Sequence, residues 1–451
     1  HQLSRGLGDV YKRQDFGSFD EQTGSSSYVI DLLFTVEAAD QPFADGLFLT
    51  NQGLVGFNNS QLQASVDGGT VQIQLRQPEL NLTKGVVSTS NPAGVYDPDP
   101  PAPVTFNDPG TPGTPWTGTI TSGDLAATPI DSNLDTVDAA DLVRFALVVE
   151  NTGGKDAYDI VVSDVLPAGM AIPAGGLNLV VTRGDGSSLT YAPVNPADPN
   201  PLFGSGIRID DEPAGGALNG LNATTAVDGT NLLIVTFDLV LVDAVEASVT
   251  YTNEGEVLNY AAGEGGNNFV YTGGPFVDDA TVTVLDPLVQ KSLVETNQPF
   301  TTDPNVAIGE IATYAFTVTV PEGFTQGLTI VDDIPAGMQF VTGSVLLDTT
   351  GFSGTVSTPA ESVGPGSGGD LTLVFDPITA TGATDTRENS FTVSYQAVVL
   401  DEPGNVGLPG NQTTLTNTAT FDYTTNLDEN GAPIGPLPAG SVDLVVVEPD
   451  L

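Results

Sequence analysis

Short runs of alternating apolar and polar residues recur along the whole chain, separated by Gly, Pro, Asn and Asp. In the last third of the chain such runs cover 288–294, 311–320, 327–332, 338–347, 371–375, 391–400, 414–423 and 442–447. Alternation with a period of two is typical of strands that bury one face. Stretches with helical periodicity are scarce. The pattern predicts an all-β chain of tandem immunoglobulin-like antiparallel β-sandwich domains.

The pattern also repeats within the chain. SDVLPAGM at 163–170 matches VDDIPAGM at 331–338. An acid precedes an alternating strand twice, at Asp141 before LVRFALVV and at Glu310 ahead of TYAFTVTV. The spacing between these features is nearly the same in both copies, which indicates an internal repeat.

Proline marks the junctions between repeats. A β run followed by proline and a new strand occurs at Pro78, Pro287 and Pro449, and a boundary proline cannot extend the preceding hydrogen-bond ladder. The junctions predict four segments: 1–14, a probable non-native leader unlike the rest; 15–77, the C-terminal part of a truncated β-sandwich repeat, with a strand at 28–37; 78–286, a long β-sandwich repeat; and 287–451, a compact one.

The long repeat differs from the compact one by an insertion at about 91–133. Its residues 91–119 are rich in proline, so we expect a surface excursion without strand or helix. The insertion contains Trp116, the only tryptophan. We expect Trp116 to pin the excursion to its own sandwich, with contact to a ligand as the alternative.

Charge and composition narrow the function. The chain has 57 acidic and 11 basic residues, with a net charge of -46, which argues against nucleic acid or an anionic membrane surface as partner. It contains no cysteine, so disulfides and thiol chemistry are excluded. The only histidine is His1. No apolar run of membrane-spanning length occurs, and a secreted, solvent-facing protein fits best.

Lysine and asparagine recur at matched places. Outside the leader the chain has three lysines, and two of them, Lys84 and Lys291, stand in the opening strand of a repeat. A charged gatekeeper on an edge strand is the alternative interpretation. Near the end of each repeat an asparagine follows an apolar residue by two positions, at Asn51, Asn259 and Asn417.

Lysine, asparagine and an acid are the groups needed for a self-formed isopeptide bond. Burial disfavours the charged forms of both lysine and a carboxylic acid, so a neutral amine can attack while the acid polarises the amide and relays protons. Holding the reacting groups in contact can lower the activation free energy by roughly 7 to 11 kcal/mol. The reaction turns over once, so no enzyme activity is predicted, and no cofactor is required.

Five short motifs of the compact repeat are similar to those of a known family of domains. They are K-S at 291–292, I-G-E-x-x-T-Y at 308–314, V-P-E-G at 320–323, D-x-I-P-A-G-M at 332–338 and L-T-N-T-A-T at 415–420. With them the repeat resembles the isopeptide-forming fimbrial-type domain and the repeat domains of large bacterial surface, adhesin-like proteins. The resemblance covers 78–286 with gaps and 15–77 in part.

The resemblance implies bond partners and an assisting acid in each repeat: Lys291, Asn417 and the acid Glu310 in the compact repeat, and Lys84, Asn259 and the acid Asp141 in the long one, where Asp138 is the competing acid. Asn51 is expected to have lost its lysine to truncation. Because many relatives keep the sandwich without these groups, the resemblance does not by itself imply that the bonds form.

The sequence thus predicts a structural stalk segment of a secreted bacterial cell-surface or fimbrial-type adhesin. Its partners would be neighbouring repeats and an unknown surface ligand. The alternative is an adhesive module stabilised by Ca²⁺, with oxygen ligands from the acidic loops 95–103, 196–201 and 427–433. A secreted hydrolase with paired carboxylates is disfavoured, because no pair stands out from the many surface acids. The tripeptide Arg183-Gly184-Asp185 is attributed to chance.

Overall fold

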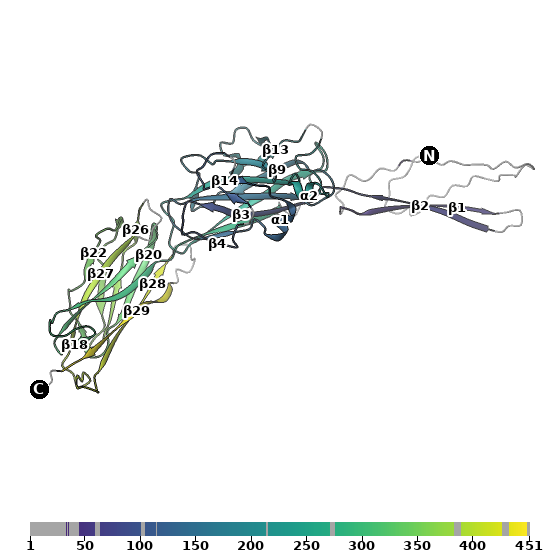
Figure 1. Cartoon of the computed structure of the whole chain (residues 1–451). Helices are drawn as coiled ribbons and strands as arrows, with labels where there is room; N and C mark the ends of the chain where they lie inside the picture. The colour runs from purple at the N-terminus through teal and green to yellow at the C-terminus, as the bar shows by residue number, and fades with distance from the viewer. Residues whose placement is uncertain are drawn as a thin grey trace, which may run out of the picture. The chain divides into compact units, whose positions relative to one another are not determined.

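The structure is a computed structural model that describes residues 33, 35, 45–58, 64–100, 104–113, 115–212, 215–270, 276–382, 389–425 and 433–448. The leader 1–14 and, apart from residues 33 and 35, the strand expected at 28–37 lie outside these residues. Figure 1 shows that strands make up nearly all of the regular structure. The chain is all-β, as the alternation predicts.

The first described element is a hairpin of two long strands, β1 (Phe48–Asn58) and β2 (Ala64–Gln74). The strands pair antiparallel along their whole length, with Asn51 opposite Val71. Every described side chain in both strands is exposed, including Phe48 and Ile73. Within the described residues this hairpin pairs with no further strand.

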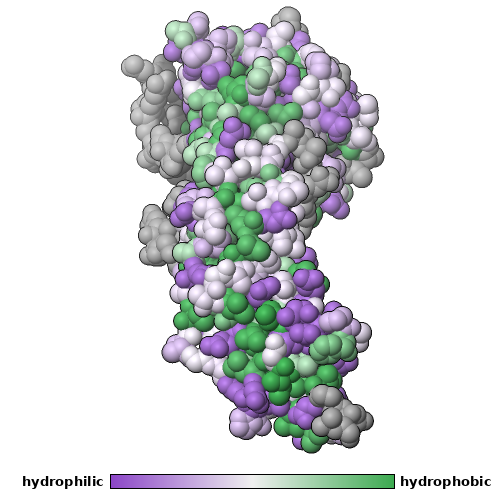
Figure 2. Space-filling view, turned by 90° about the vertical axis from the view of Figure 1, so that its left-hand side faces the viewer, coloured by the Kyte–Doolittle hydropathy of each residue, from purple (hydrophilic) through white to green (hydrophobic). Residues whose placement is uncertain are grey.

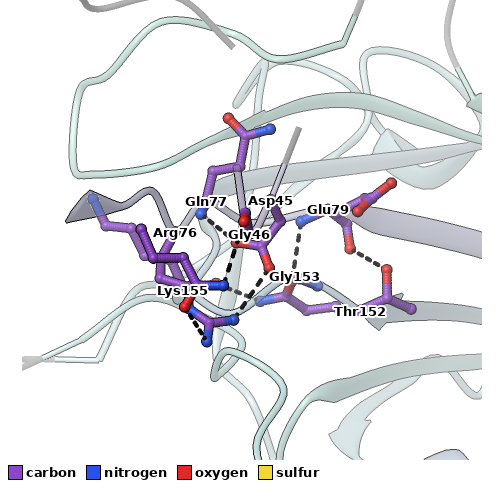
Figure 3. A network of polar contacts seen from close by, with 10 residues as sticks. Asp45, Gly46, Arg76, Gln77, Glu79, Thr152, Gly153 and Lys155 are labelled. Atoms are coloured by element: carbon purple, nitrogen blue, oxygen red, sulfur yellow. Dashed lines mark hydrogen bonds and ion pairs between the residues drawn. The ribbon is translucent and has the colours of Figure 1, made fainter. Parts of the chain in front are cut away.

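Polar contacts fix the segment that leads from β2 into the first sandwich (Figure 3). The backbone N–H of Gln77 donates to Asp45 at 2.8 Å, and that of Thr152 donates to the carbonyl of Glu79 at 2.7 Å. A Cβ at Gly153 would lie 2.2 Å from the carbonyl oxygen of Gln77. Glycine is therefore required at 153 for the close approach of the two backbone segments.

The first sandwich consists of two sheets between β3 and β16. One sheet runs in the order β3 (Leu80–Thr89), β8 (Leu142–Asn151), β14 (Leu232–Leu241) and β10 (Met170–Ala171), with β11 (Val180–Arg183) also on β14. The other runs in the order β12 (Tyr191–Pro193), β13 (Ile207–Ile209), β9 (Tyr158–Val165), β15 (Thr250–Ala261), β16 (Phe276–Val284), β7 (Asn133–Val137) and β4 (Val95–Asp97).

The insertion of the long repeat is more ordered than the sequence suggests. It contains β4, the two-stranded sheet of β5 (Thr105–Phe106) and β6 (Trp116–Thr117), and helix α1 (Ser122–Ala127), which begins with a capping box of Thr121 and Asp124. Further along lie the short helices η1 (Pro201–Phe203) and α2 (Thr225–Asp228). The expectation of no regular structure was therefore wrong, because a second apolar cluster orders this segment.

That second cluster covers the outer side of β8. Trp116 is 2% exposed and packs with Ile120 and Ile130 against Ala146 and Val148. Strand β8 is consequently buried on both faces, which explains why its sequence is a nearly continuous apolar run. The prediction that Trp116 pins the insertion to its own sandwich is confirmed.

The second sandwich also consists of two sheets. One runs in the order β17 (Leu288–Thr296), β19 (Ile311–Thr319), β27 (Ser390–Val399) and β21 (Met338–Phe340), with β22 (Leu346–Asp348) also on β27. The other runs in the order β18 (Asn305–Val306), β29 (Ile434–Val446), β28 (Thr414–Thr424), β20 (Gly323–Asp333), β25 (Asp370–Val374) and β24 (Ala360–Val363), with β26 (Ile378–Ala380) on β20 and β23 (Gly354–Thr355) on β26.

Strict alternation builds the core of the second sandwich. In β28 the inward positions hold Leu415, Asn417, Ala419, Phe421 and Tyr423, and the residues between them face outward. These side chains meet the inward residues of β17, β19 and β27 in one apolar core. Asn417 is thus a polar side chain at a core position, which raises the question of what holds it there.

Candidate isopeptide sites

In the compact sandwich the lysine of the first strand points into the core. The Lys291 side chain is fully buried, and its Nζ lies 2.7 Å from both carboxylate oxygens of Asp332 on the opposite sheet. Nζ also lies 5.0 Å from the ring centre of Tyr314. The lysine of this edge strand therefore turns inward to a buried acid and does not face solvent.

The same acid is connected to Asn417 through a tyrosine. The Tyr395 hydroxyl donates to Asp332 Oδ2 at 2.5 Å and accepts from Asn417 Nδ2 at 2.7 Å. Asn417 is 0% exposed, and its carbonyl oxygen has no hydrogen-bond partner within the described residues. A buried acceptor without a partner costs about 1–3 kcal/mol. Lysine, acid and carboxamide therefore lie in one buried chain of contacts.

The long sandwich contains the same three groups in a shorter arrangement. Lys84 Nζ contacts Asp164 Oδ2, and both side chains are fully buried. Asp164 Oδ1 accepts from Asn253 Nδ2 at 2.5 Å. One carboxylate thus touches the amine with one oxygen and the carboxamide with the other. The carbonyl oxygen of Asn253, like that of Asn417, is buried without a partner in the described structure.

Strand register places the groups identically in both sandwiches. Asp164 of β9 pairs with Gly255 of β15, two residues after Asn253, and Asp332 of β20 pairs with Ala419, two residues after Asn417. The acid and the carboxamide are therefore diagonal neighbours on the same face of one sheet. The lysine reaches them from the other sheet, so a bond would join the two layers of the sandwich.

A glycine makes room for the long site. A Cβ at Gly255 would lie 2.3 Å from Cδ1 of Leu147 and 3.3 Å from Cδ of Lys84. Real Cβ atoms do not approach other atoms as closely as the first distance, so alanine at 255 would displace Leu147. The compact sandwich has Ala419 at the matching position and accommodates it in its core.

Burial drives both lysine–acid pairs toward their neutral forms. Burial lowers the pKa of Lys84 against the opposing effect of Asp164, and it raises the pKa of Asp164 to about 6. In the compact site burial lowers the pKa of Lys291 to about 8 and raises the pKa of Asp332. Proton transfer from amine to carboxylate within each pair therefore costs less than in water.

The two acids expected from the sequence lie elsewhere. Glu310 is buried, but it accepts from the Thr301 hydroxyl at 2.6 Å and from the backbone N–H of Ala307 at 2.7 Å. Asp141 accepts from Asn91 Nδ2 at 2.8 Å and from the backbone N–H of Asp138. Each acid closes the turn ahead of the second strand of its sheet, which explains why the acid recurs in both repeats.

The asparagine expected in the long repeat is also displaced. A register shift in β15 separates Val257 from Asn259, and Asn259 donates to the backbone carbonyl of Asp159 at 2.6 Å. The structure brings Asn253 to the acid instead. The sequence does contain signals for these residues. Each asparagine that lies in a site directly follows a threonine, at 252–253 and 416–417. Each aspartate stands three residues before the proline of the repeated P-A-G-M turn.

Asn51 has the same place in its hairpin as the two buried asparagines. It is the fourth residue of β1 and follows Thr50, as Asn253 and Asn417 are the fourth residues of β15 and β28 and follow a threonine. Asn51 is exposed, and within the described residues its side chain makes no hydrogen bond to a lysine or an acid.

Three acidic side chains gather outside these sites. One carboxylate oxygen each of Asp159, Asp211 and Glu264 lies within 4.8 Å of the others. Burial, followed by the hydrogen bond with Glu264, raises the pKa of Asp211 to about 7. These residues belong to none of the loops expected to bind calcium. In the loop 196–201 the carboxylate of Asp198 accepts from the backbone N–H of Ser205. Residues 101–103 and 427–432 of the other two loops lie outside the described residues.

The Arg-Gly-Asp tripeptide at 183–185 lies in the described part of the chain. Arg183 of the Arg-Gly-Asp tripeptide donates to Glu212 at 3.0 Å and to the carbonyl of Ala217 at 3.1 Å, so its guanidinium is already engaged. Figure 2 shows one face of the molecule, on which apolar residues form small groups between polar ones. Within the described ranges no helix is both long and apolar enough to cross a membrane.

The solved structures similar to the chain include a backbone pilin and a domain of a surface protein. No protein-family model and no curated protein sequence matches it. BspA_C_mut is 10% identical, with 83% of this chain and 99% of that one covered and a TM-score of 0.27. The T6 backbone pilin of Streptococcus pyogenes is 14% identical, with 66% and 65% covered and a TM-score of 0.25. The collagen binding domain of RspB from Erysipelothrix rhusiopathiae is 13% identical, with 69% and 88% covered and a TM-score of 0.20.

Proposed function

We propose that the chain is a structural stalk segment of a bacterial cell-surface protein, and that each complete sandwich forms one isopeptide bond. The partners are Lys84 with Asn253 and Lys291 with Asn417. One observation carries the proposal: a buried lysine, a buried aspartate and a buried asparagine are connected in the same register in both sandwiches. A buried ion pair beside an amide oxygen without a hydrogen-bond partner stabilises a core less than apolar side chains of the same size would.

The reaction uses only groups of the chain. Proton transfer within the pair gives a neutral amine and a protonated Asp164. The amine nitrogen then forms a bond to the side-chain carbon of Asn253, and the bond from that carbon to Nδ2 breaks. The aspartate delivers a proton to the departing nitrogen and recovers one from the attacking nitrogen, so the products are an amide and ammonia. Its two oxygens already touch both nitrogens.

Such bonds would tie the first strand of each sandwich to the next-to-last one. The segment between the two residues would become a covalent loop, which stabilises by on the order of 4 to 5 kcal/mol in the chain-entropy model. A pull on the termini would pass from β3 through the bond into β15, or from β17 into β28. Everything between the bonded residues would be shielded from the force, and only the parts that follow Asn253 and Asn417 would extend.

The intact mass of the purified full chain tests the bonds. Two bonds lower the mass by two ammonia molecules relative to the sequence. Asp164→Asn and Asp332→Asn, each alone, should restore one ammonia, whereas Glu310→Gln and Asp141→Asn should restore none. Single-molecule pulling tests the stalk role: the wild type should release only a short length of chain, and Asn417→Ala should release the whole compact sandwich. A wild-type chain of full mass would eliminate the proposal.

A calcium-stabilised adhesive module is the second candidate, favoured by the grouping of Asp159, Asp211 and Glu264. Carboxylate oxygens are the ligands that Ca²⁺ prefers. This candidate expects the full mass and a melting temperature that falls when a chelator is added. The isopeptide proposal expects a reduced mass and melting that is insensitive to chelator.

A further inference from the structure

The two sites differ in how the acid reaches the carboxamide. In the long sandwich Asp164 Oδ1 accepts directly from Asn253 Nδ2. In the compact sandwich both oxygens of Asp332 face Lys291, and the contact with Asn417 Nδ2 is made by the Tyr395 hydroxyl. The proton route from amine to leaving group is therefore one group longer in the compact sandwich.

Strand register shows that the two rings beside Lys291 differ from those of the long sandwich only by their hydroxyls. Tyr395 pairs with Tyr314 at the place where Phe237 pairs with Phe145 in the long sandwich. The rings stack alike, with centres 5.4 Å and 5.7 Å apart and planes tilted by 22° and 21°. The long sandwich thus packs the same pair of rings beside its lysine with no hydroxyl in it.

We propose that Tyr395 is a catalytic proton relay for the Lys291–Asn417 bond, an inference that rests on the proposed function. Its oxygen touches the nitrogen that must leave and the carboxyl group that must supply the proton. No other described residue makes hydrogen bonds to both Asp332 and Asn417. The site that lacks this hydroxyl does not require it, because its acid reaches the carboxamide unaided.

The relay conserves every proton. Lys291 first gives a proton to Asp332, and the neutral amine attacks the side-chain carbon of Asn417. As the bond from this carbon to Nδ2 breaks, the phenol gives its proton to the departing nitrogen and takes one from the Asp332 carboxyl group. The carboxylate then accepts a proton from the attacking nitrogen. An amide and ammonia result, Tyr395 ends as it began, and Asp332 ends protonated, because it holds the proton that Lys291 gave up.

The surroundings keep the phenol in the form that a relay needs. Burial and the neighbouring Asp332 raise the pKa of Tyr395 well above its ordinary value, so the hydroxyl carries its proton at neutral pH. The nearby Tyr314 differs, because its hydroxyl donates to Met338 Sδ at 3.5 Å. Within the described residues it makes no hydrogen bond to Asp332. Tyr314 is therefore beside the carboxamide but off the route.

Tyr395→Phe in the full chain tests the relay, with the Lys84–Asn253 bond of the same molecule as the internal reference. Pulse-labelled chains from cell-free synthesis would be sampled by age, and each cross-linked peptide quantified by mass spectrometry. The Lys291–Asn417 bond should form about a hundredfold more slowly or worse, as expected for loss of general acid catalysis. The Lys84–Asn253 bond should form at its wild-type rate.

Two further variants separate a relay from a structural role. Tyr423→Phe is the matched control, because it removes another buried hydroxyl whose partners are Ser248 and Asp286; both bonds should form normally. Tyr314→Phe should slow the compact bond far less than Tyr395→Phe. Equal slowing by both would reduce Tyr395 to a positioning residue and overturn the relay, as would a wild-type rate in Tyr395→Phe. Failure of the proposed function is distinct, because the wild type would then form neither bond.

Discussion

The long and the compact sandwich hold a buried lysine, aspartate and asparagine in the same arrangement on two differently built frameworks. In the long sandwich the insertion with Trp116 buries β8 on both faces, whereas β19 of the compact sandwich alternates between buried and half-buried residues. The outer layer therefore varies freely. The inward lysine, aspartate and asparagine keep their register in both, which indicates that the core site and not the outer layer defines the repeat.

The largest expected effect is a difference in the free energy of unfolding between alanine variants of two asparagines in the same strand. Asn253→Ala should remove the cross-link of the long sandwich and lower its free energy of unfolding by about 4 to 5 kcal/mol. Asn259→Ala removes one hydrogen bond to a backbone carbonyl and should cost about 1 kcal/mol. Because Trp116 is the only tryptophan and is buried in this sandwich, its fluorescence in denaturant reports both values. Equal costs would contradict the assignment of Asn253.

A pH effect should appear once the bond is absent. Burial raises the pKa of Asp164 to about 6 in the presence of Asn253, above its unfolded value of about 3.9. Asn253→Ala removes a hydrogen bond that lowers this pKa, so the pKa stays raised in the folded variant. The folded state then binds more protons than the unfolded state between these values. Stability should therefore fall by roughly 2 to 3 kcal/mol as the pH rises from 4 to 6. Lys84, with its lowered pKa, acts in the opposite direction at alkaline pH, where stability should rise.

The double variant Asn253→Ala/Asp164→Asn is the control for this pH effect, and denaturant titrations followed by Trp116 fluorescence measure it. The slope between pH 4 and 6 should be smaller by the contribution of one carboxyl group. A single variant whose stability increases over this range would contradict the raised pKa of the buried acid at 164.

Exchanging the small residues beside the two acids should have a more moderate effect. Gly255→Ala would force Leu147 to move and should destabilise the long sandwich by about 1 to 3 kcal/mol. It should also slow formation of the Lys84–Asn253 bond. Ala419→Gly opens space in the compact site and should leave the Lys291–Asn417 bond intact. Denaturant titration and peptide mass mapping of both variants would show whether the long site is the more tightly packed one.

The smallest effect is expected for the acid ahead of β19. Glu310→Gln keeps the shape of the side chain but weakens its bonds to Thr301 and Ala307, and it should cost about 1 kcal/mol. The intact mass should stay two ammonia molecules below the mass of the variant's own sequence. A variant that regains one ammonia would return Glu310 to the role of assisting acid and remove Asp332 from it.

Much of the fold could be predicted from residue patterns alone. Alternation placed the main strands of the compact sandwich close to their observed bounds, and β29 begins earlier than expected, at Ile434, because the prolines at 436 and 438 concealed its start. The insertion was expected to be irregular because its proline content is high. Its order comes from apolar contacts with the outer side of β8, which no local pattern reveals.

The site was predictable only in part. Lys84, Lys291 and Asn417 stand out because lysine is rare and the Thr-Asn context recurs. The acids were misplaced because Glu310 and Asp141 recur for a different reason, the closing of a turn. Asn259 has the same parity along β15 as Asn253, and only the register shift after Val257 turns it away from the acid. Such a shift depends on pairing with β9 and is invisible in a single strand.

Peptide mapping of the wild-type chain by tandem mass spectrometry tests the central claim most directly. The account predicts two branched peptides, one joining Lys84 to Asn253 and one joining Lys291 to Asn417, each lighter by one ammonia than its two linear parts. Unmodified peptides at all four residues, or a branch from Lys84 to Asn259, would contradict it.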